Sequence, residues 1–262
     1  MGAPRAETRA AHRTMTPRSN ARLPKIPEMT IRRLSVYTRC LLQLEEDGVK
    51  TVSSQELAER FNLNSAQVRK DLAYFGEFGV RGIGYYVSGL KAELQRILGL
   101  DREWPVALVG LGNLGSALFH YKGFARQGFR IAAIFDEDPR KVEREVDSTP
   151  VFPTRDLGRE VKARGIQIAI VAVPAEAAQS VADQLVAAGI KAILNFAPAR
   201  IKVPKDVRFK NVDLSIELET LSFYLAKSSR PAPGPELYAL AASSSVPPPT
   251  DPRRPGSSDV VP

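Results

Sequence analysis

The chain has little of what builds disulfides, metal centres or membrane spans. Cys40 is its only cysteine, and His12 and His120 are its only histidines. A single cysteine forms no intramolecular disulfide, and two distant histidines supply no metal-ligand cluster. No apolar run reaches transmembrane length, and the N-terminus lacks the apolar stretch of a secretory signal. We therefore expect a cytoplasmic protein with no metal and no membrane association.

Positive charge is plentiful but unevenly placed, with a net charge of +8. Residues 1–25 hold six Lys or Arg against one acid and few large apolar groups, so they predict a disordered basic arm. Residues 228–262 are rich in Pro and Ser and predict a second disordered tail. Between the tails, acids and bases nearly balance. A DNA-binding surface there requires basic groups concentrated on one face.

Residues 26–99 have the order helix, helix, turn, helix, hairpin that is typical of a winged helix. Apolar residues at helical spacing predict a first helix that ends near Asp47: Ile31, Leu34, Tyr37, Leu41 and Leu44. Ser53 and Glu56 form the capping-box pattern that begins the second helix, and Asn64 caps the third. Alternation over residues 80–87 predicts a small hairpin, followed by a short helix over residues 90–98.

The third helix has the two faces expected of a DNA reader. Val68, Leu72 and Phe75 gather on one side as its core face, and Lys70 lies opposite them among small alanines. Side chains of this kind reach base edges or phosphates. The predicted DNA contacts are Ser65, Gln67, Arg69 and Lys70, with Arg81 at the hairpin tip. A winged domain that binds protein through a solvated basic face is the alternative.

Residues 100–214 alternate strand and helix. Strands are expected at 105–110, 130–135, 166–173, 190–196 and near 207–212, and helices at 113–127, 154–164 and 175–188. This order predicts an α/β fold with a parallel, doubly wound, Rossmann-like sheet. A last helix, residues 215–227, is apolar on more than one side, which predicts burial between bodies or simple packing within one subunit.

A G-x-G-x-x-G motif lies between the first strand and helix of this block. Gly110 permits a tight turn, Gly112 lets the backbone approach a pyrophosphate, and Gly115 lets helix and strand pack closely. Asp136, at the end of the next strand, is placed to accept hydrogen bonds from an adenosine ribose. The predicted cofactor-binding residues are Gly110, Leu111, Gly112, Asn113, Leu114, Gly115 and Asp136.

The ribose end of this predicted site carries charge of both signs. Asp136 favours NAD(H) over NADP(H), although Arg140 and Lys141 nearby weaken that preference. Pro174 and residues 195–198 follow the third and fourth strands and are candidates to line the nicotinamide end, or are ordinary strand-end turns. A glycine-rich turn that binds another ligand, or none, is the alternative for the whole loop.

Five segments together resemble the redox-sensing transcriptional repressor family Rex. They are VRKDLAYFGEFGVRGIGY (68–85), VGLGNLGSAL (109–118), VPAEAAQ (173–179), AAGIKAILNFAP (187–198) and NVDLS (211–215). The resemblance covers about residues 26–227 and neither tail. It implies a repressor that senses NADH and NAD⁺ as regulatory ligands, binds a palindromic double-stranded operator, and releases it when NADH rises.

The resemblance also implies an assembly and a switch. The expected unit is a homodimer in which residues 215–227 swap onto the partner. By matched position, Arg39, Tyr121 and Asp213 are expected to form a polar switch between the two domains and the swapped helix.

Two other functions remain open at this point. An NAD-dependent dehydrogenase needs an acid/base and a substrate pocket, for which residues 120–122 (His-Tyr-Lys) are the only candidate cluster. A CoA-binding ligase-type subunit shares this Rossmann variant but needs a phosphorylatable histidine on a loop. Neither histidine satisfies that requirement well, so we expect a regulator and no enzyme.

Overall fold

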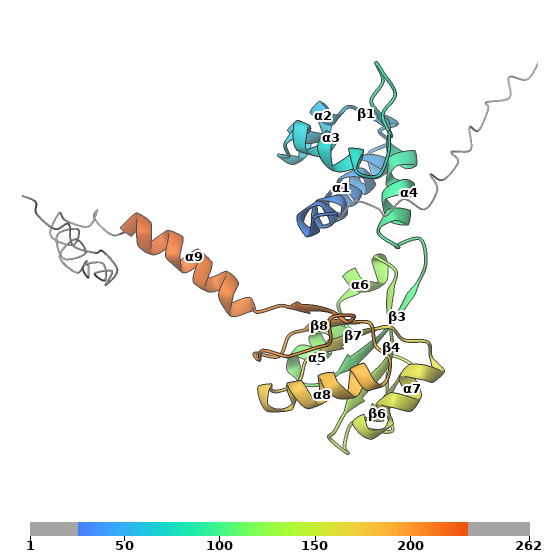
Figure 1. Cartoon of the computed structure of the whole chain (residues 1–262), viewed down its shortest axis with the longest axis vertical. Helices are drawn as coiled ribbons and strands as arrows, with labels where there is room; N and C mark the ends of the chain where they lie inside the picture. The colour runs from blue at the N-terminus through green and yellow to red at the C-terminus, as the bar shows by residue number, and fades with distance from the viewer. Residues whose placement is uncertain (1–25, 230–262) are drawn as a thin grey trace, which may run out of the picture.

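The computed structural model describes residues 26–229, with the chain traced from blue to red in Figure 1. The two tails expected to be disordered lie outside these residues, apart from the first two positions of the C-terminal one. No helix among the described residues is long and apolar enough to cross a membrane.

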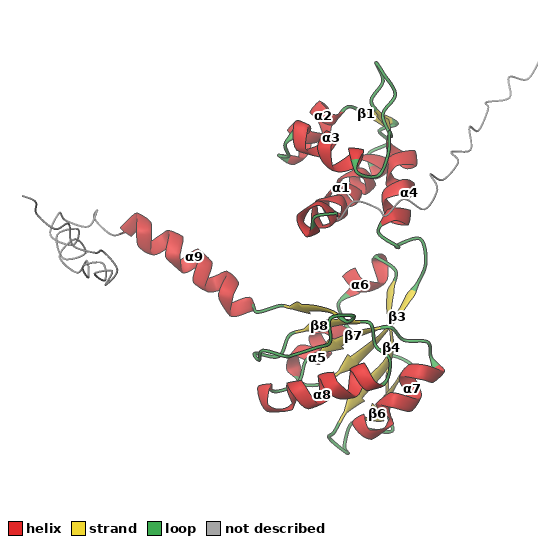
Figure 2. Cartoon of the chain, in the orientation of Figure 1, coloured by secondary structure: helices red, strands yellow, loops and turns green. Residues whose placement is uncertain are grey.

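The N-terminal unit is helical with one small sheet (Figure 2). Its elements are α1 (Glu28–Glu46), β1 (Thr51–Val52), α2 (Ser54–Phe61), α3 (Ser65–Ala73), β2 (Tyr85–Tyr86) and α4 (Val87–Ile97). The capping box that begins α2 is confirmed, because the Glu56 N–H donates to Ser53 Oγ at 3.0 Å and the Ser53 N–H donates to Glu56 at 2.7 Å. Asn64 caps α3 by accepting the Gln67 N–H at 2.9 Å.

The wing differs from the predicted hairpin over residues 80–87. The only pairing within that segment is an isolated bridge between Val80 and Gly84, while β2 pairs antiparallel with β1. Gly84 explains this arrangement. Its φ is +92°, and a Cβ there would lie 2.5 Å from the carbonyl oxygen of Val52, so only glycine brings the wing this close to β1. The segment between α3 and β2 projects at the top of Figure 1.

One apolar core holds this unit together. It joins α1, α2, α3 and α4 through buried residues that include Leu34, Leu41, Leu57, Leu72 and Leu94. Ile31 is an exception to the predicted apolar face, since it is 44% exposed.

The C-terminal unit is a seven-stranded sheet with helices on both faces. Its strands are β3 (Trp104–Val109), β4 (Phe129–Asp136), β5 (Glu145–Val146), β6 (Thr149–Pro153), β7 (Ile168–Val171), β8 (Ala192–Asn195) and β9 (Arg208–Asn211). Their order is β5-β6-β4-β3-β7-β8-β9, and all neighbours are parallel except β5 with β6. From β6 to β9 this is the Rossmann order, so the doubly wound prediction is confirmed. Its switch point lies beside β3.

Two apolar cores lie on opposite faces of this sheet. Helices α7 (Leu157–Ala163) and α8 (Ala175–Ala187) contribute to one core, and α5 (Asn113–Phe119) and α6 (Lys122–Arg126) to the other. A short 3-10 turn, residues 154–156, precedes α7.

Two predictions for this unit are wrong. The spacing predicts one helix over residues 113–127, but an extended backbone at Tyr121 separates α5 from α6. The break lets Phe119 and Phe124 pack on the same core, although five residues apart they would point about 140° apart on one helix. The sequence pattern also missed β5 and β6; the prolines at the second and last positions of β6 are typical of a loop.

The last helix, α9 (Leu214–Ser229), extends away from the sheet in Figure 1. Its apolar side chains are well exposed within the single chain, each by more than half: Leu214, Ile216, Leu218, Leu221, Phe223, Tyr224 and Leu225. A packing helix within one subunit is therefore not what this chain forms by itself.

Candidate nucleotide and DNA sites

The three motif glycines occupy three different environments at the end of β3. Gly110 has a φ of +95°, and a Cβ there would lie 2.5 Å from the carbonyl oxygen of Ala172. A Cβ on Gly115 would lie 1.9 Å from the carbonyl oxygen of Gly110. Gly112 has no atom within 4 Å of its Cβ position. Gly110 and Gly115 are thus required by the protein itself, whereas the space at Gly112 is open to a ligand.

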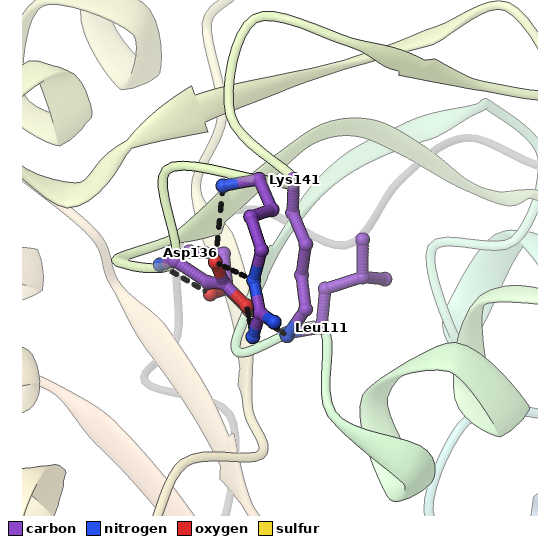
Figure 3. Close-up of polar contacts among 5 residues, drawn as sticks. Leu111, Asp136 and Lys141 are labelled. Carbon is purple, nitrogen blue, oxygen red and sulfur yellow. Dashed lines mark hydrogen bonds and ion pairs between the residues drawn. The ribbon is translucent and has the colours of Figure 1, made fainter.

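Asp136 lies beside this loop and is held by it (Figure 3). Its carboxylate accepts the Leu111 N–H at 2.7 Å and the Asp138 N–H at 2.8 Å, and the Lys141 ammonium lies 3.3 Å away. The side chain is 12% exposed. The carboxylate therefore fixes the glycine loop to the end of β4, in addition to the ribose-binding role that its position predicts.

Both cations near Asp136 face carboxylates. Arg140 donates to Asp138 from its Nε at 3.0 Å and its Nη2 at 2.8 Å, and Lys141 lies 4.0 Å from the same carboxylate. The guanidinium of Arg140 and its backbone N–H lower the pKa of Asp138 to about 2. Asp138 is therefore ionised at neutral pH.

The strand ends that were candidates for the nicotinamide pocket are strongly hydrogen-bonded. Asn195 is fully buried, and its amide donates to the Ala197 carbonyl at 2.9 Å and to the Asn211 side chain at 2.6 Å. It ties β8 to β9. Pro174 precedes α8 as its N-cap residue. These contacts explain how the turns are shaped, and they leave the lining of the nicotinamide end a prediction.

The outer face of α3 carries the basic side chains expected there. Arg69, Lys70 and Arg81 are exposed, and Arg69 donates to Ser54 Oγ at 2.8 Å. Within residues 26–229, Lys70 and Arg81 form no ion pair. Both are free to meet a phosphate. Ser65 lies in the first turn of α3 and is half-buried.

Gln67 differs from this picture because its side chain points partly inward. Its amide nitrogen donates to Asp71 Oδ1 at 2.9 Å. Asp71 is fully buried and lies on the same stripe as Val68 and Leu72, a position that sequence periodicity assigns to the core. A charged residue on an apolar stripe was the signal that could have identified it.

Asp71 collects hydrogen bonds mainly from α1. Arg33 donates from Nε at 2.6 Å and from Nη2 at 2.8 Å, Tyr37 donates at 2.9 Å, and Thr30 donates at 3.1 Å. Burial opposes ionisation of Asp71, but these donors and Gln67 outweigh it and lower its pKa to about 2. Desolvation, together with the adjoining carboxylate, raises the pKa of Tyr37. The carboxylate thus anchors α3, the helix predicted to read DNA, to α1.

Metal and thiol chemistry have no support in the described part of the chain. No group of three or more His, Cys, Asp or Glu there is arranged to hold a metal ion. Cys40 is buried in the core of the N-terminal unit, and burial raises the pKa of its thiol. A protonated, buried thiol is a poor nucleophile.

Comparisons with known proteins agree with both halves of this architecture. A family model described as "Putative DNA-binding protein N-terminus" matches residues 25–73, and one described as "CoA binding domain" matches residues 101–199. A redox-sensing transcriptional repressor Rex of Syntrophomonas wolfei is 54% identical over 206 residues, which cover 79% of this chain and 98% of that protein. The chain belongs to the Rex family.

Solved structures extend the similarity to three dimensions. A structure of RSP in complex with β-NAD⁺ and operator DNA is 38% identical, with a TM-score of 0.76, and covers 85% of this chain and all of that one. A structure of RSP with β-NADH is 37% identical, with a TM-score of 0.70, over 83% of this chain and 99% of that one.

Membership of the Rex family decides between the functions left open by the sequence. The relatives are named as transcriptional repressors, which confirms the expectation of a regulator over a dehydrogenase or a ligase subunit. The match to the CoA-binding model reflects the shared Rossmann variant. One expectation is corrected. The Rex protein of Streptomyces coelicolor aligns over 255 residues, 97% of this chain, so the resemblance extends into both tails.

The three residues implied in the Rex switch lie in three separate parts of the chain: Arg39 on α1, Tyr121 between α5 and α6, and Asp213 just before α9. Arg39 lines a small cleft, of about 120 Å³, with Gln95 of α4, Arg126 at the end of α6 and Gln127 after it. Tyr121 is 60% exposed and packs edge-on against Phe124 at 5.1 Å.

Asp213, the third of these residues, accepts the Ser215 N–H at 3.0 Å at the start of α9. Within one chain, over residues 26–229, no hydrogen bond or ion pair joins any two of Arg39, Tyr121 and Asp213. The N-terminal and C-terminal units do meet through an ion pair of Glu28 with Lys210.

Proposed function

We propose that this chain is a DNA-binding transcriptional repressor that senses the NADH/NAD⁺ ratio and releases its operator when NADH binds. The observation that carries the proposal is the open space at Gly112, beside a carboxylate at the end of the next strand, in a chain whose recognition helix presents unpaired cations. Relatives solved with β-NAD⁺ and operator DNA and with β-NADH support both ligands.

Each domain has its own task in this proposal. Residues 26–99 bind DNA, through Ser65, Gln67, Arg69, Lys70 and Arg81. Residues 100–214 bind the cofactor, through Gly110, Leu111, Gly112, Asn113, Leu114, Gly115 and Asp136. In the first turn of α5, backbone N–H groups have no partner within the helix and are available to a pyrophosphate. Gln67 acts with one amide hydrogen already engaged by Asp71.

The active unit is a homodimer on a palindromic operator. Residues 215–227 within α9 carry apolar side chains on more than one side, and these are exposed in the single chain. Such a helix is stable when it is buried between two bodies. A dimer then presents two recognition helices to two half-sites. A repressor of chromosomal genes acts in the cytoplasm of a bacterial cell.

The switch must distinguish two cofactors that share nearly every contact. NADH and NAD⁺ differ only in the nicotinamide ring, so only a different affinity for two dimer arrangements can drive release. A tenfold change in operator affinity needs about 1.4 kcal/mol of coupling. Arg39, Tyr121 and Asp213 supply that coupling across the dimer in this proposal, with Asp213 brought by the partner's α9.

The test is an electrophoretic shift on a palindromic operator, with NADH and NAD⁺ titrated in turn. We expect NADH to release the DNA and NAD⁺ to leave it bound. Gly112→Ala should retain the fold and DNA binding, because its methyl group enters open space. The variant should lose NADH binding, and its DNA binding should no longer respond to NADH. A wild-type chain that stays on the operator at saturating NADH would contradict the proposal.

A further inference from the structure

The ribose end of the nucleotide site contains two cations that the sequence leaves unexplained. Arg140 and Lys141 follow β4 directly, where a nearby arginine accommodates the 2′-phosphate of NADP(H) in other Rossmann domains. In this chain they face two carboxylates, Asp136 and Asp138. The four formal charges of the cluster sum to zero.

The two carboxylates hold these cations in different ways. Asp136 is bonded to the glycine loop through the Leu111 N–H and lies 3.3 Å from Lys141. Asp138 is not bonded to the loop. It accepts the backbone N–H, Nε and Nη2 of Arg140, all within 3.0 Å, and so holds the guanidinium in a bidentate pair.

We infer that Asp138 is a specificity-determining residue, because its pair with Arg140 denies that guanidinium to a 2′-phosphorylated dinucleotide at the ribose end of the site. This inference rests on the proposed cofactor site. A 2′-phosphate adds negative charge beside Asp136 and Asp138, and the guanidinium of Arg140 beside them is already engaged by Asp138. Asp138 thus turns a basic segment into one that rejects NADPH.

Asp138 can be removed without damage to the loop, unlike Asp136. Loss of Asp136 frees the Leu111 N–H and changes the loop that both dinucleotides need. Loss of the Asp138 charge leaves that contact in place. Asp138→Asn even keeps a side-chain oxygen that can accept the Arg140 N–H, so it isolates the charge and the bidentate pair.

The experiment titrates the full-length chain with NADH and NADPH, followed by the fluorescence of the reduced nicotinamide. Asp138→Asn should lower the ratio of the NADPH Kd to the NADH Kd by about tenfold, the effect of one unit charge near an exposed phosphate, with NADH affinity nearly unchanged. Adding Arg140→Ala to Asp138→Asn should restore most of the wild-type ratio of the two Kd values. Arg140→Ala alone should not improve NADPH binding, since it leaves Asp138 unpaired.

The matched control is Glu137→Gln. This substitution removes the same charge from the same loop. Glu137, however, accepts a hydrogen bond from the Thr154 hydroxyl and contacts neither cation. An equal gain in NADPH affinity in Glu137→Gln would show that any lost negative charge in this loop has the same effect, and it would overturn the inference. So would an unchanged ratio in an Asp138→Asn protein that binds NADH normally. Failure of the wild-type chain to bind NADH would instead overturn the proposed function.

Discussion

The glycine loop after β3 is shaped mainly by close backbone contacts, whereas α3 is oriented by a network of side chains. Around the loop, Gly110 and Gly115 are required because carbonyl oxygens occupy the space of a side chain. Around α3, the buried carboxylate of Asp71 joins Arg33 and Tyr37 of α1. The loop therefore depends on its two glycines and on one carboxylate, Asp136, which accepts the Leu111 N–H, while α3 depends on a network of several side chains around one buried charge.

Asp71→Ala should have the largest effect on stability. It leaves Arg33 and the Tyr37 hydroxyl without their acceptor, and removing one partner of a buried ion pair costs about 3 kcal/mol at the low end of the usual range. The low end applies because the Arg33 side chain is 32% exposed. Amide hydrogen exchange should show lost protection in α3 while β3 stays protected. The control is Asp183→Ala, which removes an exposed aspartate whose side chain accepts a hydrogen bond from Gln179. Equal losses in both variants would contradict an anchoring role.

Gly115→Ala should destabilise the cofactor domain by about 2 kcal/mol, the usual cost of a side chain forced into an occupied space. The added methyl group meets the Gly110 carbonyl, so the loop must move even without ligand. Gly112→Ala is the matched control, and the midpoint of its urea unfolding should equal that of the wild-type chain. If both variants unfold alike, the two glycines do not have the distinct roles that their surroundings indicate.

Acid should loosen α3 by protonating Asp71. The pKa of Asp71 is lowered from 3.8 to about 2 in the folded chain, so its contribution to stability is complete above pH 4. That contribution is lost as the pH falls from about 4 towards 2. Hydrogen exchange of α3 measured across this window should follow the loss in the wild-type chain. In Asp71→Asn, the hydrogen exchange of α3 should not change with pH across this range. The same pH dependence as in the wild-type chain would assign the acid response to another group.

Lys70→Ala and Arg81→Ala should have small, separate effects on DNA binding. Each removes one exposed cation, so each should lower the salt dependence of operator affinity by about one unit of slope. The fold should not change, because neither side chain is in the core. Glu59→Ala, on the neighbouring helix, removes an exposed group of opposite sign and should not lower the slope. Wild-type slopes in both cation variants would place the DNA on another face.

Local signals in the sequence predict much of this fold. The capping pair Ser53 and Glu56 and the cap Asn64 locate α2 and α3, because these interactions span only three residues. The glycine motif likewise identifies the loop at the end of β3. Alternating strands and helices give the parallel sheet, since crossover connections leave few other arrangements.

The features that were missed depend on distant partners. Asp71 meets Arg33 across 38 positions of sequence, and Asp136 meets Leu111 across 25. Periodicity describes one element at a time and does not show which side chains two elements share. The break at Tyr121 has the same origin, because the sheet core beneath α5 and α6 decides where the helix must turn.

Helix α1 makes contacts with both functional halves of the molecule. Its buried side is bonded to the recognition helix through Asp71, while Arg39 and Glu28 face the cofactor domain. A tilt of α1 is expected to carry α3 with it, because the Asp71 network bonds the two helices together. Over its 19 residues, about 28 Å, a rotation of 10° about one end moves the other by roughly 5 Å. This displacement exceeds the rise of one base pair, so we expect a modest rotation of the cofactor domain against α1 to move α3 out of register with the bases it contacts.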